Sequence, residues 1–424
     1  MEKQKSSSII FFIENDRPGG VDSFILSLVK YWPNKNDRII LVHNYNHPGA
    51  KIYQRISHYC KIDSLYIPLS FVFSKAIFGF FPQKLQQFFR PIFKLFFFPI
   101  QFLIIQKYFK KADADILMVI NGGYPGGETC RVANIVWNSL YKYSRPNFHN
   151  FHNFAVSPFY GTRWYENFVD KIFLNSISGM IGVSKVCAQS LTQRDGLKQY
   201  LPSYIYNGID QNNTALKELP SEITDLGLSK SQMCIMLANY EDRKGHEFVI
   251  KSFKKVLNKL PNVHLIFCGA GSEEEIIKVT KLTEKYNVAQ NIHILNFIEN
   301  GSLLIPFFDL LLVGSQEFES FGLVVAEAML SKVPVISTST GGLREVLKDN
   351  CGGYLIDRND EEAYSKCIIK LLESESLRIK VGEQGFNRVK SKFNAKLMAQ
   401  KYHNRLVGNL EWIEKVNKVL KNND

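Results

Sequence analysis

The sequence lacks several features that would place it in common protein classes. Its seven cysteines contain no Cys-x-x-Cys pair, which argues against a disulfide framework or a zinc site and fits a reducing, cytoplasmic compartment. The first apolar run, Ile9–Ile13, is too short for a signal peptide and predicts a buried strand instead. The longest uncharged apolar stretch, between Lys94 and Lys107, has twelve residues, whereas a membrane-spanning helix needs ~20.

Acidic residues are missing from one long segment, since none occurs between Asp63 and Asp113. The net charge of +12 lies entirely within residues 1–200, of which residues 51–111 contribute +9, and residues 201–424 sum to zero. We therefore expect the two halves of the chain to meet different partners, with an anionic partner for the first half. The remaining composition, 45% hydrophobic and 22% charged residues, is that of an ordinary folded protein.

Short apolar runs alternate with segments of helical period along the chain. This pattern predicts buried parallel strands joined by right-handed helical crossovers, with ligands at the carboxyl ends of the strands. The runs that predict strands are Ile9–Ile13, Ile39–Val42, Ile116–Ile120, Met233–Leu237, Val263–Phe267, Ile292–Leu295, Asp309–Val313 and Val333–Ser337. Two Rossmann-like domains joined near residues 202–220 are the most economical interpretation, with a further helix over Lys396–Leu420.

The segment 314–329 follows one of these runs and predicts a strand, a glycine-containing loop and a helix. Free backbone N–H groups at the helix start, together with the helix dipole, would attract an anion such as a diphosphate. These donors belong to Phe321, Gly322 and Leu323. Glu327, about one turn into the helix, could accept two hydrogen bonds from a ribose diol. Glu319 precedes the helix and would lie near the group attached to the far phosphate.

Two glutamates eight residues apart are a weak signal by themselves, since a solvated helix face would also produce them. The flanking segments Lys332–Ser337 and Gly341–Val346 make the pattern specific. Together these segments resemble the retaining glycosyltransferases of family 4, also called group 1 glycosyltransferases, which have the GT-B fold. Further segments that match this family in order are Gly19-Gly20, Gly182–Lys185, Tyr206–Asp210, Lys244–His246 and Cys268–Gly271.

The resemblance covers most of residues 9–395 and implies an α/β protein with two Rossmann-like domains whose parallel sheets face each other across a cleft. Residues 1–203 would form an acceptor-binding domain and residues 204–395 a nucleotide-sugar-binding domain. A helix within residues 396–424 would return to the first domain. Gly19 and Gly20 would lie where the donor meets the acceptor, and sugar transfer would retain the anomeric configuration.

The resemblance also assigns Lys244 to a basic pair that neutralises the diphosphate leaving group, where preorganised charge contributes most to catalysis. The usual arginine five residues earlier is Asn239 in this chain, which leaves the affinity for the donor open. Arg243 is adjacent, but neighbouring residues at a helix start point in different directions, so it is not an assured substitute. An ordinary lysine at a helix start is the alternative for Lys244.

Residues 147–154 contain His-Asn-Phe twice, close to where the family places a histidine that contacts the donor sugar. We expect His152, rather than His149, to be that residue, with a neutral imidazole that positions the sugar and is not a nucleophile. A histidine satisfied at a strand end is the alternative for either. Because only Glu319 is placed near the sugar, we expect front-face departure and attack, in which the leaving phosphate takes the acceptor proton.

Asp113-Ala114-Asp115 is an Asp-x-Asp sequence, by which other glycosyltransferases chelate a metal-bound diphosphate. Here it precedes a predicted strand, so we expect a helix-to-strand turn, and we expect neither a metal nor another cofactor. The loop Asn121–Gly127 follows that strand and could contact the acceptor, with an ordinary turn as the alternative.

Residues 71–109 contain thirteen phenylalanines with lysine and arginine among them. These aromatics are too apolar and contiguous to stack on bases, so nucleic acid is not an expected partner. Core packing is one interpretation. We favour one or two amphipathic helices, divided at Pro82, Pro91 and Pro99, that lie in an anionic membrane surface.

The sequence thus predicts a retaining, metal-independent glycosyltransferase that is cytoplasmic and peripheral on the inner face of the plasma membrane. It would move a sugar from a UDP- or GDP-linked donor to a lipid-linked or growing saccharide acceptor in cell-surface polysaccharide synthesis, such as capsule or O-antigen. One alternative is the same fold with a soluble acceptor. Another is a degenerate, non-catalytic binding subunit, which Asn239 favours and which intact Lys244, Glu319 and Glu327 oppose.

Overall fold

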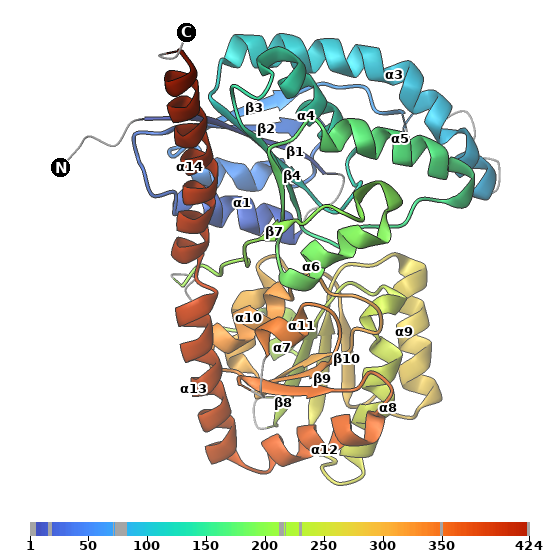
Figure 1. Ribbon diagram of the computed structural model, residues 1–424. Helices are drawn as coiled ribbons and strands as arrows, with labels where there is room; N and C mark the ends of the chain where they lie inside the picture. Colours follow the sequence, from blue (N-terminus) through green and yellow to red (C-terminus); the bar gives the residue numbers. More distant parts are fainter. Residues whose placement is uncertain are drawn as a thin grey trace. The chain divides into compact units, whose positions relative to one another are not determined.

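The computed structural model describes residues 6–15, 19–70, 72, 83–211, 216, 218–228, 231–347 and 351–421, of which 83–90, 412 and 414–421 are described by their backbone alone. The chain divides into two compact units, Met1–Gly208 with Ala395–Asp424, and Ile209–Asn394. Each unit contains a parallel sheet with helices packed on it, so the expected pair of Rossmann-like domains is confirmed (Figure 1).

Seven strands form the sheet of the first unit: β1 (Ser8–Glu14), β2 (Arg38–Asn44), β3 (Lys61–Leu65), β4 (Ile116–Asn121), β5 (Asn147–Phe151), β6 (Gly179–Gly182) and β7 (Ser203–Tyr204). They lie in the order β3-β2-β1-β4-β5-β6-β7. The helices of this unit are α1 (Gly20–Lys30), α3 (Gln83–Ala112), α4 (Glu128–Tyr141), α5 (Arg163–Leu174), α6 (Lys185–Gln189) and α14 (Ala395–Lys421). Short 3-10 turns are η1 (Ala50–Ile56), η2 (Tyr160–Thr162), η3 (Ser190–Gln193) and η4 (Asp195–Leu197).

Strand β1 explains why helices cover both faces of this sheet, since all of its residues are buried. Side chains alternate between the two faces of a strand. Ile9, Phe11 and Ile13 join a cluster with residues of α1 and α14. Ile10 and Phe12 join a second cluster with residues of α3 and α4. The continuous apolar run in the sequence is therefore the mark of a central strand.

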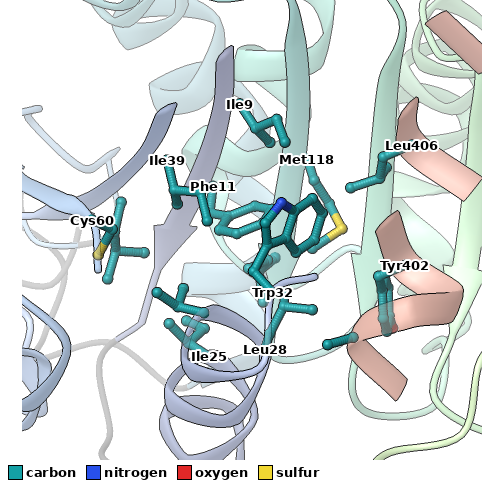
Figure 2. Close-up of a cluster of buried hydrophobic side chains, with 14 of the residues drawn as sticks. Ile9, Phe11, Ile25, Leu28, Trp32, Ile39, Cys60, Met118, Tyr402 and Leu406 are labelled. Carbon is teal, nitrogen blue, oxygen red and sulfur yellow. The ribbon is translucent and has the colours of Figure 1, made fainter. Parts of the chain in front are cut away.

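Helix α14, from the end of the chain, completes the core of the first unit. Figure 2 shows the indole of Trp32 at the centre of a cluster that includes Tyr402 of α14. The Tyr402 ring lies 5.4 Å from that of Phe24, and the His403 ring lies 5.2 Å from that of Trp32. The indole N–H of Trp32 donates to Asp37 at 2.7 Å. Burying such aromatic side chains contributes on the order of 2 to 3 kcal/mol each.

Helix α3 is continuous from Gln83 to Ala112, with Pro91 and Pro99 inside it. The expected division of the helix at these two prolines is therefore wrong, whereas Pro82 lies outside the described residues. Each proline removes one backbone hydrogen bond. Packing of the helix on α4 offsets that loss, because Ile105 and Phe109 are fully buried there.

The other side of α3 is exposed and apolar, with Ile92, Leu95, Phe96 and Leu103 more than half exposed. By length and composition alone, Pro91–Ala112 is the one helix among the described residues that could cross a membrane, although one of its faces packs on the unit. It is longer than the twelve-residue uncharged stretch suggested.

Six strands form the sheet of the second unit: β8 (Met233–Leu237), β9 (His264–Cys268), β10 (Ile292–Leu295), β11 (Leu310–Val313), β12 (Val335–Thr338) and β13 (Gly353–Ile356). They lie in the order β10-β9-β8-β11-β12-β13. The helices are α7 (Ser221–Thr224), α8 (His246–Leu257), α9 (Glu273–Lys285), α10 (Leu323–Leu330), α11 (Leu343–Val346), α12 (Glu361–Leu372) and α13 (Glu375–Lys392). The 3-10 turns are η5 (Asp242–Lys244) and η6 (Gly301–Phe307). The five strands expected here form, and β13 is an additional edge strand.

Candidate active site

Three loops meet at the carboxyl edge of the second sheet, after β8, β11 and β12. The backbone N–H of Gln316 donates to the carbonyl of Arg243 at 2.8 Å, and that of Gly342 donates to the carbonyl of Glu319 at 2.7 Å. The strand order reverses between β8 and β11, because the chain runs outward from β8 to β10 and then returns to β11 on the other side. Ligands of doubly wound sheets bind at this reversal, so the three loops form the candidate site of the second unit.

Glycine lets the first two loops approach each other. Gly245 follows η5 with a φ of 74°, and a Cβ there would lie 1.9 Å from the carbonyl oxygen of Gly314. A residue with a side chain would have to push the loops apart and would also be strained at this φ. Gly245 therefore keeps η5, and with it Lys244, against the loop after β11.

Glu319 is the centre of the contacts that result. The Nζ of Lys244 forms an ion pair with Oε1 of Glu319, and the hydroxyl of Ser315 donates to the same oxygen at 3.0 Å. Both charged side chains are largely buried, at 18% exposed for Lys244 and 15% for Glu319. The two charges of such a pair attract each other more strongly than those of an exposed pair, because less water screens them. The structure thus brings together Lys244 and Glu319, which lie 75 residues apart in the chain.

Arg243 also reaches this carboxylate, since one of its guanidinium nitrogens lies 4.0 Å from Oε1 of Glu319. Glu241 holds the guanidinium from the other side, with its Oε2 2.5 Å from Nε of Arg243. The 3-10 turn η5 therefore directs both neighbouring cations toward Glu319, which the sequence did not lead us to expect. Asn239 is exposed and reaches this group only through Glu241, to which its side-chain amide donates at 3.3 Å.

Helix α10 starts beside this ion pair, with Gly322 as its N-cap at a φ of 90°. The first-turn N–H groups of a helix carry partial positive charge, and Gly322 has no side chain to cap them. The side chain of Phe321 is 1% exposed and packs edge-on against Phe393, so this side chain belongs to the core of the unit. Leu323 is half-buried and begins the helix.

Glu327 lies on α10 and is half-buried. Among the residues that the structure describes, none donates a hydrogen bond to its carboxylate or forms an ion pair with it. Burial therefore raises the pKa of Glu327 to about 7. A ligand that donated hydrogen bonds to this carboxylate would stabilise its charged form.

In the first unit the strand order reverses between β1 and β4, and Gly19 and Gly20 lie just after β1. Gly20 begins α1, and the N–H of Gly19 donates to Asp22 at 2.9 Å. Among the residues that the structure describes, none lies within 4 Å of a Cβ built on Gly19.

Asp22 is a residue of this site that the sequence pattern did not indicate. Its Oδ1 contacts Nε2 of His47 at 2.9 Å and accepts from the hydroxyl of Tyr53 at 2.6 Å. Burial by itself would raise the pKa of Asp22, but hydrogen bonds from His47 and Tyr53 lower it below its ordinary value. The ionised carboxylate fixes the backbone of the glycine loop. His47 and Tyr53 lie more than twenty residues further along the chain, so no local motif marks them.

His152 follows β5, and its backbone N–H donates to the backbone carbonyl of Asn121 at 3.0 Å. Its Nε2 contacts the side-chain oxygen of Asn150 at 2.7 Å, and its ring lies edge-on to Phe24 of α1 with centroids 4.4 Å apart. Burial lowers its pKa to about 3, so the imidazole is neutral at physiological pH. His152 is thus held beside the helix that Gly20 begins.

His149 lies three residues before His152, within β5, and is fully buried. Its two ring nitrogens contact the side chains of Asn134, at 2.8 Å, and Asn121, at 3.2 Å. Both nitrogens are therefore engaged within the core. His149 therefore fits the alternative interpretation of the repeated His-Asn-Phe triplet, a histidine whose ring nitrogens are both engaged within the protein.

The Asp-x-Asp sequence lies in the turn between α3 and β4. Asp113 pairs with Arg145 at 2.7 Å, and Asp115 accepts from the N–H of Ser8 at 2.8 Å. Both carboxylates therefore hold the strand ends. Among the described residues, no group of three or more His, Cys, Asp or Glu side chains could hold a metal ion.

The loop Asn121–Gly127 follows β4 and is closed by the side chain of Asn121. This amide donates to the carbonyl of Pro125 at 2.9 Å and accepts from the N–H of Gly127 at 3.0 Å. The loop lies at the reversal of strand order of the first unit, beside the loop after β1.

Comparison with known proteins places these sites in context. Residues 222–388 match the family described as Glycosyl transferases group 1, and this range contains Asn239, Lys244, Glu319 and Glu327. The chain is 28% identical to N-acetyl-alpha-D-glucosaminyl L-malate synthase of Bacillus anthracis over 199 residues, which cover 47% of this chain and 51% of the relative. It is 30% identical to the capsular polysaccharide biosynthesis glycosyltransferase CapM of Staphylococcus aureus, over 37% of this chain and 40% of that protein. The chain therefore matches about half or less of the length of these relatives.

A solved structure extends the likeness to nearly the whole fold. Anabaena Alr3699/HepE, in complex with UDP and glucose, superimposes with a TM-score of 0.73 over 95% of this chain and 100% of that chain, at 17% sequence identity. At this identity the likeness establishes the fold. The protein therefore has the GT-B fold, with two Rossmann-like parallel-sheet domains.

Proposed function

We propose that the protein is a retaining glycosyltransferase that moves a sugar from a nucleoside-diphosphate sugar to a saccharide or lipid-linked acceptor. One observation carries the proposal: the Lys244–Glu319 ion pair lies at the reversal of strand order in the second sheet. The match of residues 222–388 to group 1 glycosyltransferases supports it. So does the complex of Anabaena Alr3699/HepE with UDP and glucose.

The second unit would hold the donor. Backbone N–H groups at Phe321, Gly322 and Leu323 would face the diphosphate, and Lys244 with Arg243 would neutralise its charge. When the bond between the sugar and the phosphate breaks, negative charge builds up on the phosphate oxygen. Cations fixed in place beforehand stabilise that charge without reorganising.

Two carboxylates of this unit would orient the rest of the donor. Glu327 would accept hydrogen bonds from the ribose diol, which suits a carboxylate that has no partner among the described residues. Glu319 would accept from hydroxyls of the sugar once Lys244 turns to the diphosphate. The base is proposed to be uracil or guanine.

The first unit would bring the acceptor to the reacting carbon. His152, which is neutral, would position the sugar, and the region in front of Gly19 and Gly20 would admit the acceptor. The acceptor hydroxyl would attack from the face that the phosphate leaves, and its proton would pass to the leaving phosphate. This route retains the configuration and uses no metal ion, in keeping with the engaged carboxylates of Asp113 and Asp115.

The acceptor is proposed to be lipid-linked, and the protein to lie on the inner face of the plasma membrane. The exposed apolar side of α3 supports this, together with the exposed Lys107, Lys110 and Lys111 near its end. Such a face suits the surface of an anionic membrane, where each cation adds about 1 kcal/mol. The product would enter a cell-surface polysaccharide.

The test of this function is turnover of UDP- and GDP-sugars by the variant Glu319→Ala. We expect turnover to fall by about 10²-fold or more, because the sugar would lose its acceptor of hydrogen bonds. Glu317→Ala is the matched control, since Glu317 lies two residues away, is exposed, and should leave turnover unchanged. Unchanged turnover in the Glu319 variant, with a melting temperature equal to that of the wild type, would refute the assigned role.

A further inference from the structure

The first unit contains a cavity of about 400 Å³ between α3, α5 and the loops that follow β4 and β5. Its wall includes Pro91 and Lys94 of α3, Pro125, Phe159, Glu166 and Arg194. Pro125 belongs to the loop Asn121–Gly127, so the cavity adjoins the carboxyl edge of the first sheet. Ligands of such sheets bind at this edge.

A network of buried ion pairs forms one side of the cavity. Arg131 lies 2.9 Å from Glu166 and 3.0 Å from Asp170, and Arg194 lies 2.8 Å from Glu166 and 2.7 Å from Asp170. Burial alone would raise the pKa of Glu166, but Arg131 and Lys94 lower it to about 2. Two arginines are thus matched by two carboxylates, and Lys94 is one cation more than this pairing requires.

Lys94 adds one positive charge to this network. Its Nζ lies 3.4 Å from Glu166, the longest of these ion pairs, and the side chain is 26% exposed. Burial lowers the pKa of Lys94 even though Glu166 opposes that effect. A partly buried cation with a shared counter-ion gains stability from an added anion, since the anion offsets the loss of hydration.

The rim of the cavity is apolar. Val156 and Phe159 line the cavity and are also exposed, at 62% and 40%. Ile92 and Leu95, on either side of Lys94 along α3, are exposed as well. Further exposed apolar side chains on α5 are Trp164, Phe168 and Ile172. Single exposed apolar residues are common, but a group on two neighbouring helices marks a contact surface.

We propose that this cavity receives the phosphate of a lipid-linked acceptor, with Lys94 against the phosphate and the lipid chain leaving over the rim into the bilayer. A long-chain phosphate ester requires a cation for its phosphate and an apolar surface for its chain. The partly buried Lys94 and the apolar rim above it offer both. The inference rests on the proposed function, which it deepens by naming the phosphate as the recognised group of the lipid-linked acceptor and Lys94 as the residue that recognises it. The residues that line the cavity all belong to the first unit, and none of them is a residue of the candidate donor site.

The experiment is flotation of the full-length protein with three kinds of vesicle: phosphatidylcholine alone, phosphatidylcholine with phosphatidylglycerol, and phosphatidylcholine with a polyisoprenyl phosphate at the same total charge. We expect the wild type to bind the polyisoprenyl phosphate vesicles about tenfold more tightly than the phosphatidylglycerol vesicles. Lys94→Gln should remove this preference, and Lys94→Arg should keep it. Lys107→Gln is the matched control for charge, because Lys107 is an exposed lysine of the same helix outside the cavity wall: it should weaken binding to both anionic vesicles alike and leave the preference between them intact.

A second variant guards against misfolding of the Lys94 variants. Val156→Glu places a negative charge at the exposed rim and should also remove the preference, whereas Val156→Gln should keep most of it. Equal losses in Lys94→Gln and Lys107→Gln would overturn the proposal, as would a wild type with no preference for the phosphate lipid. Inorganic phosphate that bound as tightly as the lipid would overturn it too, since the lipid would then contribute nothing.

Titration with UDP separates this inference from the proposed function. Both the wild type and Lys94→Gln should bind UDP with equal affinity, because Lys94 is not part of the donor site. A wild type that bound the phosphate lipid but neither UDP nor GDP would refute the proposed function and leave the lipid site standing. The reverse result would refute the lipid site alone.

Discussion

The two units carry the same kind of sheet but equip its carboxyl edge differently. In the second unit the edge holds charge: an ion pair between Lys244 and Glu319, a second cation at Arg243, and the carboxylate of Glu327. In the first unit the imidazole of His152 is neutral, the ionised Asp22 is engaged by His47 and Tyr53, and no described residue lies within 4 Å of a Cβ built on Gly19. The excess of positive charge nevertheless lies in residues 1–200. Under the proposed function, net charge would mark the surface that meets an anionic partner, whereas the chemistry would depend on a few charges placed within a neutral domain.

The contrast predicts that removing charge damages the second unit most. Lys244→Gln should lower kcat/KM for the donor by 10²- to 10³-fold, about 3 to 4 kcal/mol, because the leaving diphosphate loses a fixed cation. Steady-state kinetics measure this loss. Lys278→Gln, which breaks an exposed ion pair with Asp242, is the control and should change kcat/KM by less than about twofold. A loss in the control equal to that in Lys244→Gln would contradict the role of Lys244.

In the first unit, added bulk should matter more than charge. Gly19→Ala should lower kcat/KM for the acceptor by about tenfold or more, since a methyl group would occupy the space that the acceptor enters. The melting temperature should not change, because the methyl meets no described residue within 4 Å and the backbone there is extended, at a φ of 170°. Gly408→Ala, also without a contact within 4 Å, should leave the kinetics unchanged. A Gly19 variant with normal kinetics would show that the two edges differ less than we propose.

Protonation of Glu327 offers a smaller test on the second unit. Its pKa of about 7 in the folded protein is raised from an ordinary value of 4.5, so it weakens folding as the pH rises through that interval. A bound ribose diol favours the charged form, so UDP binding near pH 6.5 should release roughly half a proton or more from this group. Calorimetry in two buffers of different ionisation enthalpy measures the release.

UDP itself also titrates near this pH. Glu327→Gln is therefore the control that separates the proton released by the protein from the proton released by UDP. The variant should bind UDP about tenfold more weakly and should lack the protein's share of the proton release. It should also lose the decrease in stability between pH 4.5 and 7 that this carboxyl causes. Equal proton release in both proteins would mean that Glu327 does not meet the ribose.

The smallest expected effect is that of Arg243. Its guanidinium lies 4.0 Å from Glu319, farther than the ammonium of Lys244, so Arg243→Gln should lower donor kcat/KM by about threefold to tenfold. A double-mutant cycle with Lys244→Gln measures whether the two cations act on the same charge. Additive losses would show that Arg243 acts elsewhere and does not compensate for Asn239.

Strands β1, β2, β4 and β8 to β12 could be predicted because each is a continuous apolar run, as in Ile9–Ile13 and Met233–Leu237. Strands β3, β5, β6, β7 and β13 were not predicted, and β5 shows why, since it is fully buried although its sequence contains polar residues. The continuity of α3 could not be predicted either, because the packing of Ile105 and Phe109 on α4 decides whether Pro91 and Pro99 are tolerated. Local rules describe the cost of a proline and do not include the tertiary contacts that offset it.

The candidate site divides in the same way. The strand, loop and helix of residues 314–329 indicate Glu319, and the family resemblance indicates Lys244, but their direct contact depends on two loops that only the fold brings together. The position of Arg243 depends on the turn η5 and on Glu241, neither of which has a recognisable pattern. The cavity beside Lys94 could not be predicted from the sequence, because its wall comes from residues spread between 91 and 194.

Helix α14 has a consequence for how the chain is made. Among the described helices it lies last along the chain, yet Tyr402 and His403 pack on Phe24 and Trp32, which belong to α1 and the turn after it. Unit Ile209–Asn394 is continuous in sequence and can fold as soon as it leaves the ribosome. The earlier unit must wait with one face of its sheet incompletely covered until the ribosome reaches residue 395. A nascent chain stalled before α14 should therefore bind chaperones through the part synthesised first.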